Sequence, residues 1–390
     1  MINLQGKRNS ALIFADKIDK QTKTQIASLL RQEAYADSKI RIMPDTHAGK
    51  HVAVGTTMTL NGRISPLLLG VDIGCGMEVV LLDENDADLP KLDEIIHSLI
   101  PCGSKIHDAP KAFFDLSALH CREHVNHERA QRSIGTLGGG NHFIELDRLQ
   151  NGHLMLVIHS GSRQLGSDLS TYYSDLAYKT ACKKARKQVK KERYNREDEG
   201  YYTKSFKREN KVDVKREEAF LEGEYFSQYL HDLATVTAFA DLNRRTMAEL
   251  ICEQMHFKVS DRFSCVHNYI DTEEMILRKG AIRARQGERV IIPLNMRDGA
   301  ILGRGLGNPG WNFSAPHGAG RVCNRTDAKF TYTVEEFQNE MAGIYTTTAT
   351  EGSLDECPMM YKAPERILEF LSESVEVEQI AKPVYNFKAC

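Results

Sequence analysis

A continuous apolar run, Leu154-Met155-Leu156-Val157-Ile158, constrains the fold more than any other stretch of this chain. Five apolar residues in succession, without polar alternation, predict a strand that is buried on both faces. The run leads directly into His159-Ser160-Gly161-Ser162-Arg163. Because α/β architectures place their chemistry where buried strands end, we expect functional side chains in this second run.

The rest of the chain alternates between helical and strand-like patterns. Apolar residues recur with helical spacing at 11–34, 90–100, 219–256 and 364–372, whereas strand-like runs lie at 40–43, 52–60 and 289–293, with a loop expected at 44–51. Length alone suggests roughly two or three domains of ~150 residues. Because the sequence has neither an internal repeat nor a Pro/Ser linker, we predict one α/β (α+β) domain over residues 1–390.

Composition excludes several classes of protein. Hydrophobic residues make up 41% and charged residues 27%, which is typical of soluble globular proteins. The first residues lack the apolar core of a signal peptide, and no apolar run approaches the ~18 residues of a membrane span. Nine cysteines in 390 residues are too few for a disulfide scaffold. We therefore expect reduced thiols, no membrane contact and a cytoplasmic location.

A basic segment interrupts this ordinary composition at residues 183–216. It contains 14 basic and 6 acidic residues, a balance of about +8 (14 minus 6) in a chain whose net charge is −2. The pattern predicts an inserted helical arm. The arm is either simply solvated or contacts an RNA backbone, in which case the interleaved aromatic rings could stack on unpaired bases: Tyr194, Tyr201, Tyr202 and Phe206.

Five metal-ligand side chains lie in or beside glycine turns or at strand ends: Asp72, Cys75, His142, His159 and His267. A mixture of Cys, His and Asp suits borderline-soft divalent ions, with zinc, manganese and cobalt all open. No two of these histidines have zinc-finger spacing, so the site would be assembled from distant segments. Taken singly, each residue also fits a packed thiol, a hydrogen-bonded histidine or a capping aspartate.

A second glycine-rich stretch, Ser314-Ala315-Pro316-His317-Gly318-Ala319-Gly320-Arg321, surrounds one histidine. Glycines let backbone N–H groups approach a phosphate closely, and an arginine can bind its oxygens through two parallel hydrogen bonds. A histidine in this setting is a candidate nucleophile that accepts a phosphate group. Considered alone, the stretch also fits a loop histidine beside a turn.

Together these motifs resemble the RtcB family of RNA-splicing ligases. The resemblance extends from Met43-Pro44-Asp45 to Lys388, which is nearly the whole chain. Its most specific pieces are Gly70-Val71-Asp72-Ile73-Gly74-Cys75-Gly76-Met77, Gly140-Asn141-His142-Phe143-Ile144-Glu145, His159-Ser160-Gly161-Ser162-Arg163, His267-Asn268 and His317-Gly318-Ala319-Gly320-Arg321.

The resemblance implies a fold with mixed sheets around a dinuclear metal cleft. It implies joining of RNA 3′-phosphate or 2′,3′-cyclic phosphate ends to 5′-hydroxyl ends, in RNA repair or tRNA splicing. His317 would attack the α-phosphate of GTP and hold GMP, which then passes to RNA to give RNA-ppG. Two Mn²⁺ ions would be bound, with the Cys75 thiolate bridging them, by Asp72, Cys75, His142, His159 and His267. We expect a monomer or a weak homodimer.

The same resemblance implies a pocket for a guanine nucleotide. Glu145 and Lys388 would read the guanine edge, and Tyr361 would pack near the base. Asn141 and Asn268 would bind phosphate oxygens. The positions implied for nucleotide contact are Asn141, His142, Phe143, Ile144, Glu145, His267, Asn268, Pro293, Asn295, Met296, Gly318, Ala319, Gly320, Tyr361 and Lys388.

One loop departs from the family pattern. After Pro293 the family usually has Gly-Ser/Thr-Met-Gly with a serine shortly beyond, whereas this chain has Leu294-Asn295-Met296-Arg297-Asp298-Gly299-Ala300. Leu294 and Arg297 occupy the glycine positions, and Ala300 lacks a hydroxyl group. Two alternatives therefore stay open: an RNA-end binding protein that does not ligate, and a metal-dependent cyclic phosphodiesterase.

Overall fold

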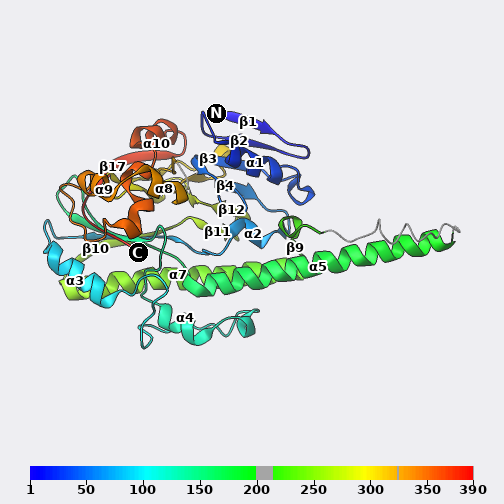
Figure 1. Ribbon diagram of the computed structural model, residues 1–390, viewed down its shortest axis with the longest axis horizontal. Helices are drawn as coiled ribbons and strands as arrows, with labels where there is room; N and C mark the ends of the chain where they lie inside the picture. The colour runs from blue at the N-terminus through cyan, green and yellow to red at the C-terminus, as the bar shows by residue number, and fades with distance from the viewer. Residues whose placement is uncertain (199–213, 323–324, 390) are drawn as a thin grey trace.

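The computed structural model describes residues 1–198, 214–322 and 325–389 (Figure 1). It combines helices with several sheets, which confirms the predicted α/β class. Within these residues no helix is both long enough and apolar enough to span a bilayer.

Seven strands form the larger sheet, in the order β10-β6-β8-β7-β17-β15-β14, and each neighbouring pair is antiparallel. Their bounds are β10 Val259–Val266, β6 Gly76–Leu82, β8 Leu154–Ser160, β7 Phe143–Arg148, β17 Val375–Lys388, β15 Gly299–Gly305 and β14 Arg289–Asn295. The predicted buried strand is confirmed as β8, because all seven of its residues are buried. Met155 and Val157 pack into one core cluster, whereas Leu156 and Ile158 pack into another on the opposite face.

Six strands form the second sheet, in the order β1-β2-β3-β4-β12-β11. Their bounds are β1 Ile2–Gln5, β2 Ser10–Ile13, β3 Ile40–His47, β4 Val54–Thr59, β12 Ile276–Lys279 and β11 Asn268–Asp271. Two shorter sheets pair β13 (Ala281–Arg283) with β16 (Ser314–Pro316) and β5 (Arg63–Ile64) with β9 (Leu221–Glu222). His267 lies between β10 and β11, where the chain passes from the larger sheet to the second one.

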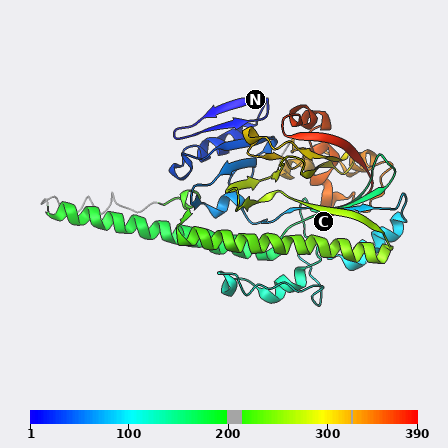
Figure 2. The same ribbon diagram turned by 180° about the vertical axis from the view of Figure 1, so that it is seen from behind.

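The two longest helices, α5 (Arg163–Asp198) and α7 (Glu224–Met255), lie side by side along the body of the molecule (Figure 1, Figure 2). Arg244 of α7 is fully buried and donates hydrogen bonds to Gly74 O at 2.7 Å and Ser160 O at 2.9 Å. One helix is thereby tied to the two loops that carry Cys75 and His159.

The other helices of the described residues are α1 Lys20–Leu29, α2 Pro66–Leu69, α3 Leu89–Leu99, α4 His127–Ser133, α8 Arg325–Thr331, α9 Val334–Glu340 and α10 Pro364–Leu371. The 3₁₀ turns are η1 Glu33–Tyr35, η2 Arg122–His124, η3 Arg216–Glu218, η4 Pro309–Trp311, η5 Glu351–Glu356 and η6 Pro358–Met360.

Most predicted elements are confirmed, with three corrections. The helical pattern at 219–256 was wrong for its first residues, because Leu221–Glu222 forms β9 and α7 begins at Glu224. The helical pattern at 11–34 was wrong for its first residues, because Ser10–Ile13 forms β2 and only Lys20–Leu29 is helical. The loop expected at 44–51 was also placed too early, because β3 continues to His47. Of the basic segment at 183–216, α5 accounts for the part up to Asp198. Three of its four aromatic residues, Tyr201, Tyr202 and Phe206, and the side chain of Tyr194 lie outside the described residues.

Candidate active site

A cavity of about 710 Å³ opens between the two larger sheets. Its walls come from loops and strand ends far apart in the sequence. The predicted site residues that line it are Asp72, Cys75, Asn141, Phe143, Glu145, His159, His267, Asn268, Pro293, Asn295, Met296, His317, Gly318, Ala319, Gly320, Tyr361 and Lys388. Among the predicted residues, His142 and Ile144 do not line it. His142 lies behind Cys75, and Ile144 packs into the core on the opposite face of β7.

The five predicted metal ligands come together at one end of the cavity. Cys75 Sγ lies 3.1 Å from His159 Nε2 and 3.5 Å from His142 Nε2. His159 Nε2 is 3.3 Å from His267 Nε2, and Asp72 Oδ2 is 3.5 Å from His142 Nε2. Zinc-type ions bind thiolate at ≈ 2.3 Å and imidazole at ≈ 2.0–2.1 Å. Donor atoms separated by little more than 3 Å can therefore share one ion.

Backbone carbonyls hold two of these imidazoles in place. His142 Nδ1 lies 2.8 Å from Leu137 O, and His159 Nδ1 lies 3.1 Å from Asn141 O. A ring that donates its Nδ1 hydrogen to a carbonyl leaves the Nε2 lone pair available to a metal. Both Nε2 atoms point toward Cys75.

Two buried polar atoms beside this cluster indicate that a ligand belongs there. His267 Nδ1 and Asn268 Oδ1 are buried, and neither finds a hydrogen-bond partner within the described part of the chain. The amide nitrogen of Asn268 is by contrast held by the carbonyl oxygen of Asp72. Buried polar atoms are almost always paired, so these two atoms and the donor set fit a bound metal ion.

The electrostatics of the cluster also suit a metal. Burial lowers the pKa of His159 and His267 well below its usual value, which leaves neutral imidazoles with free lone pairs. Burial, together with the neighbouring Asp72 carboxylate, raises the pKa of the Cys75 thiol. Burial opposes ionisation of Asp72, but contacts with His142 outweigh it and lower the pKa of that carboxyl. A bound divalent ion would displace the thiol proton.

His317 stands next to this cluster, paired with an aspartate that the sequence analysis did not assign. His317 Nδ1 lies 2.6 Å from Asp45 Oδ2, and the His317 backbone N–H donates to the same oxygen at 3.3 Å. Asp45 lies in β3 and is fully buried. The ring centroids of His317 and His267 are 4.9 Å apart. With Nδ1 committed to Asp45, the Nε2 lone pair remains free.

At the other end of the cavity, β7 and β17 bring Glu145 beside Asn386 and Phe143 beside Lys388. The Asn386 amide donates to Glu145, whose pKa is raised by burial and by the neighbouring Asp147 carboxylate. Lys388 Nζ donates to Asn141 O at 3.2 Å and lies 5.0 Å from the centre of the Phe143 ring. A buried carboxylate and a buried ammonium thus face the same space.

A buried carboxylate that the sequence analysis missed, Glu356, organises this end. It accepts hydrogen bonds from Arg321 and from the Tyr361 hydroxyl, and forms ion pairs with Arg325 at 2.7 Å and Lys388 at 3.0 Å. Burial opposes ionisation of Glu356, but the positive charges of Lys388 and Arg321 outweigh the effect of burial. The pKa of Glu356 is therefore lowered. The acidic position in Asp355-Glu356-Cys357-Pro358 had no glycine turn or strand end to single it out.

The divergent loop keeps its unusual arginine out of the cavity. Arg297 donates to Asp298 Oδ1 at 2.9 Å and pairs with Glu340 of α9. Leu294, Asn295 and Met296 line the cavity instead. Leu294 also packs into the hydrophobic core and is only 2% exposed. The loop therefore adds the apolar side chains of Leu294 and Met296 to the cavity wall.

A mixed α/β fold with a buried Cys/His cluster, a part-buried aspartate beside it and an aspartate-paired histidine next to it defines a candidate metalloenzyme. Comparison with known proteins identifies its family. The family described as tRNA-splicing ligase RtcB matches residues 25–113 and 114–389, and this chain belongs to the RtcB family.

Individual relatives match over most of their length. RNA-splicing ligase RtcB of Escherichia coli strain K12 is 31% identical over 381 residues, which cover 87% of this chain and 87% of the relative. The tRNA-splicing ligase RtcB of Aeropyrum pernix is 24% identical over 461 residues, covering 92% and 90%. That of Thermococcus kodakarensis is 24% identical over 433 residues, covering 87% and 85%.

Proposed function

We propose that this protein is a GTP- and manganese-dependent RNA ligase that joins 3′-phosphate or 2′,3′-cyclic phosphate ends to 5′-hydroxyl ends, in RNA repair or tRNA splicing. Its membership of the RtcB family makes it a ligase that acts on RNA ends. The use of GTP and manganese is supported by the donor set and by the charged residues of the cavity.

The observation that carries the proposal is the pairing of His317 with Asp45 at 2.6 Å. His317 Nε2 attacks the α-phosphorus of GTP and forms an N–P bond, while the bond to the bridging oxygen breaks and pyrophosphate leaves. The ring gains positive charge in this step. Asp45 keeps the Nδ1 hydrogen in place and stabilises that charge, as an aspartate does for a catalytic histidine elsewhere.

The metal ligands would be Asp72, Cys75, His142, His159 and His267, and Cys75 Sγ lies within 3.5 Å of the Nε2 atoms of both His142 and His159. When bound, the ions supply positive charge that offsets the charge of the phosphates and of the pyrophosphate leaving group. The chain itself contributes rigid imidazoles whose orientation the backbone fixes.

Glu145 and Lys388 would read the guanine edge. A base that presents N–H groups to Glu145 would favour its ionised form, and Lys388 would donate to the guanine carbonyl. Tyr361 and Phe143 would line the base, Asn141 would bind phosphate oxygens, and the remaining contacts would come from His267, Asn268, Pro293, Asn295, Met296, Gly318, Ala319 and Gly320.

The RNA steps then start from the GMP that His317 holds. An oxygen of the RNA 3′-phosphate attacks the phosphorus of the GMP held by His317, the N–P bond breaks, and RNA-ppG forms. The 5′-hydroxyl of the second RNA end attacks the RNA phosphorus, loses its proton and releases GMP. A 2′,3′-cyclic phosphate would first be hydrolysed to a 3′-phosphate.

Intact-protein mass spectrometry after incubation with GTP and Mn²⁺ tests the proposal. We expect a mass gain equal to GMP in the parent and in His153→Ala, a control that removes a partly exposed histidine whose Nδ1 lies 2.9 Å from Asp83 O. We expect no gain in His317→Ala. A gain in His317→Ala, or none in the metal-loaded parent, would overturn the assignment.

The apolar wall at Leu294 favours one second candidate. An RNA-end binding protein that does not ligate could keep the metal site while the loop hinders close approach of a nucleotide. Binding of 3′-phosphate RNA by the metal-loaded parent, without any GMP adduct, would support that candidate instead.

A further inference from the structure

Helix α5 leaves the body of the protein part-way along its length (Figure 1, Figure 2). Its first half is anchored by buried side chains, of which Leu169, Tyr173 and Ala177 are at most 1% exposed. Residues 178–189, here called the α5 arm, include no buried residue, although the helix continues to Asp198. The arm contacts the body through partly buried side chains, among them Tyr178 and Ala181, and its cations Lys179, Lys183 and Lys187 are exposed.

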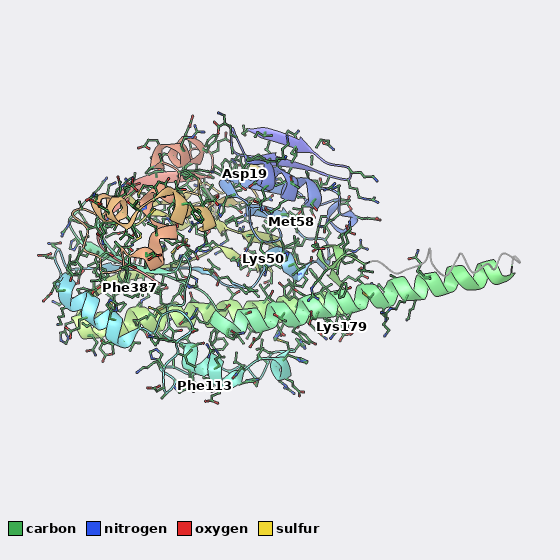
Figure 3. The ribbon with its side chains drawn as sticks, in the orientation of Figure 1. Asp19, Lys50, Met58, Phe113, Lys179 and Phe387 are labelled. Atoms are coloured by element: carbon green, nitrogen blue, oxygen red, sulfur yellow. The ribbon has the colours of Figure 1, made fainter. Side chains whose placement is uncertain are left out.

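The α5 arm is strongly cationic. It contains five cations and no acidic residue, and Figure 3 labels the first cation, Lys179, on the exposed helix. Four of them follow the spacing i, i+4, i+7, i+8 and so share one helix face: Lys179, Lys183, Arg186 and Lys187. The fifth, Lys184, lies off this face and pairs with Glu222 of β9.

Such a stripe does not serve the helix itself. Like charges at i and i+4, as in Lys179–Lys183 and Lys183–Lys187, destabilise a helix by about 0.2–0.5 kcal/mol per pair. The arm has no carboxylate of its own to relieve this repulsion. A polyanion from outside the chain would relieve it, and a row of phosphates is the natural match for cations repeated along a rod.

The stripe has a fixed distance from the candidate active site, because one helix connects them. α5 begins four residues after His159, and its first residue, Arg163, donates to Gly103 O at 2.6 Å and to Thr136 Oγ1 at 3.1 Å. At 1.5 Å per residue, Lys183 lies about 30 Å and Lys187 about 36 Å along the axis from this anchor. With about 2.8 Å per base pair of an A-form RNA duplex, that is roughly ten to thirteen base pairs.

We propose that the α5 arm binds the phosphate backbone of a duplex region roughly ten to thirteen base pairs from the RNA end that is being joined. The inference rests on the proposed function, and it specifies the substrate as a folded RNA whose stem extends that far. The arm would select RNA by length and shape and would not contact the reacting phosphate.

Binding without GTP tests this, so that chemistry plays no part. Two RNAs with the same 3′-phosphate end would carry duplexes of about five and about twenty base pairs, and affinity would be measured by fluorescence anisotropy at several salt concentrations. The test variant is Lys183→Gln/Arg186→Gln/Lys187→Gln. Its control, Lys91→Gln/Arg245→Gln/Lys258→Gln, removes three exposed cations from α3, from α7 and from the position just before β10. Helix α3 and strand β10 lie at the opposite end of the molecule from the arm (Figure 1).

We expect the arm variant to bind the longer duplex about tenfold or more weakly, with a slope of log K against log salt shallower by about 2–3, because each lost phosphate contact removes ~0.9. The shorter duplex should bind as it does to the parent, and the control should match the parent on both. An unchanged slope for the longer RNA, or an equal loss in the control, would overturn the inference.

A change of oligomeric state with unchanged RNA affinity would show that the arm binds a second copy instead. If the parent fails to form the GMP adduct, the proposed function falls, while these binding curves still decide the role of the arm.

Discussion

Replacing Gly320 with alanine should disable His317 without removing any group that takes part in the reaction. Gly320 has φ +77°, and an added Cβ would lie 2.9 Å from the carbonyl carbon and 3.0 Å from the Cα of Asp45. Carbon atoms prefer separations of about 3.5–4.0 Å, so Asp45 must move by roughly 0.5–1 Å. The 2.6 Å contact between Asp45 and His317 would then lengthen or break. Misplacement on this scale costs about 10²-fold in rate.

Gly343→Ala provides the matched control. Gly343 has φ +88°, but an added Cβ would meet nothing within 4 Å. Both variants pay about 1–2 kcal/mol for a left-handed non-glycine residue, which corresponds to a fall in Tm of about 1–3 °C for a chain of this size. Only Gly320→Ala should also slow the attachment of GMP to the protein, and mass spectrometry over time measures that rate. Equal rates in the two variants would refute the idea that contact with Asp45 controls His317.

Three further predictions follow from other contacts. Asp45→Asn should slow GMP attachment by about 10²–10⁴-fold, since an amide can hold His317 in the wrong tautomer; a rate within twofold of the parent would contradict this. Cys75→Ala should lose bound metal, measured by elemental analysis, whereas the partly exposed Cys182→Ala should keep it; normal metal content in Cys75→Ala would exclude a bridging thiolate. Burial, together with the Asp241 carboxylate, raises the pKa of Glu78 to about 7. The folded protein therefore keeps its full stability below pH 4.5 and loses part of it as the pH rises through 7, because the buried Glu78 must then ionise. Glu78→Gln should therefore raise the free energy of unfolding by up to about 3 kcal/mol at pH 8 and hardly at all at pH 4; parallel pH profiles in urea unfolding would argue against it.

Periodicity predicted the elements that are long or deeply buried. The apolar run of β8 and the helical pattern of α7 each specify one structure, because burial on two faces and a long 3.6-residue period have no close alternative. Near the N-terminus the pattern was ambiguous. Residues 11–13 share helical spacing with Ile18 and Ile26, yet Leu12 pairs with Asn3 of β1 and with Arg41 of β3. Such pairing depends on partners that a short window cannot show.

The candidate site divides in the same way. Ligand-type residues beside glycine turns were recognisable, because a glycine turn next to Cys or His is a local feature. Asp45 was not, since its partner His317 lies 272 residues away. Glu356 likewise gains its place from Arg321 and Arg325, which lie four residues apart, and from Lys388 near the end of the chain. Roles that exist only as long-range pairs need the folded chain.

The position of β17 has a consequence for how this protein is made. β17 (Val375–Lys388) lies between β7 and β15 in the middle of the larger sheet, although every other strand of that sheet precedes it in the chain. Until the ribosome has released these residues, β7 and β15 each expose an unpaired edge, and unpaired edges are templates for association with other chains. A nascent chain stalled shortly before residue 375 would thus be a candidate for chaperone binding, with all five proposed metal ligands already synthesised but its largest sheet still in two halves.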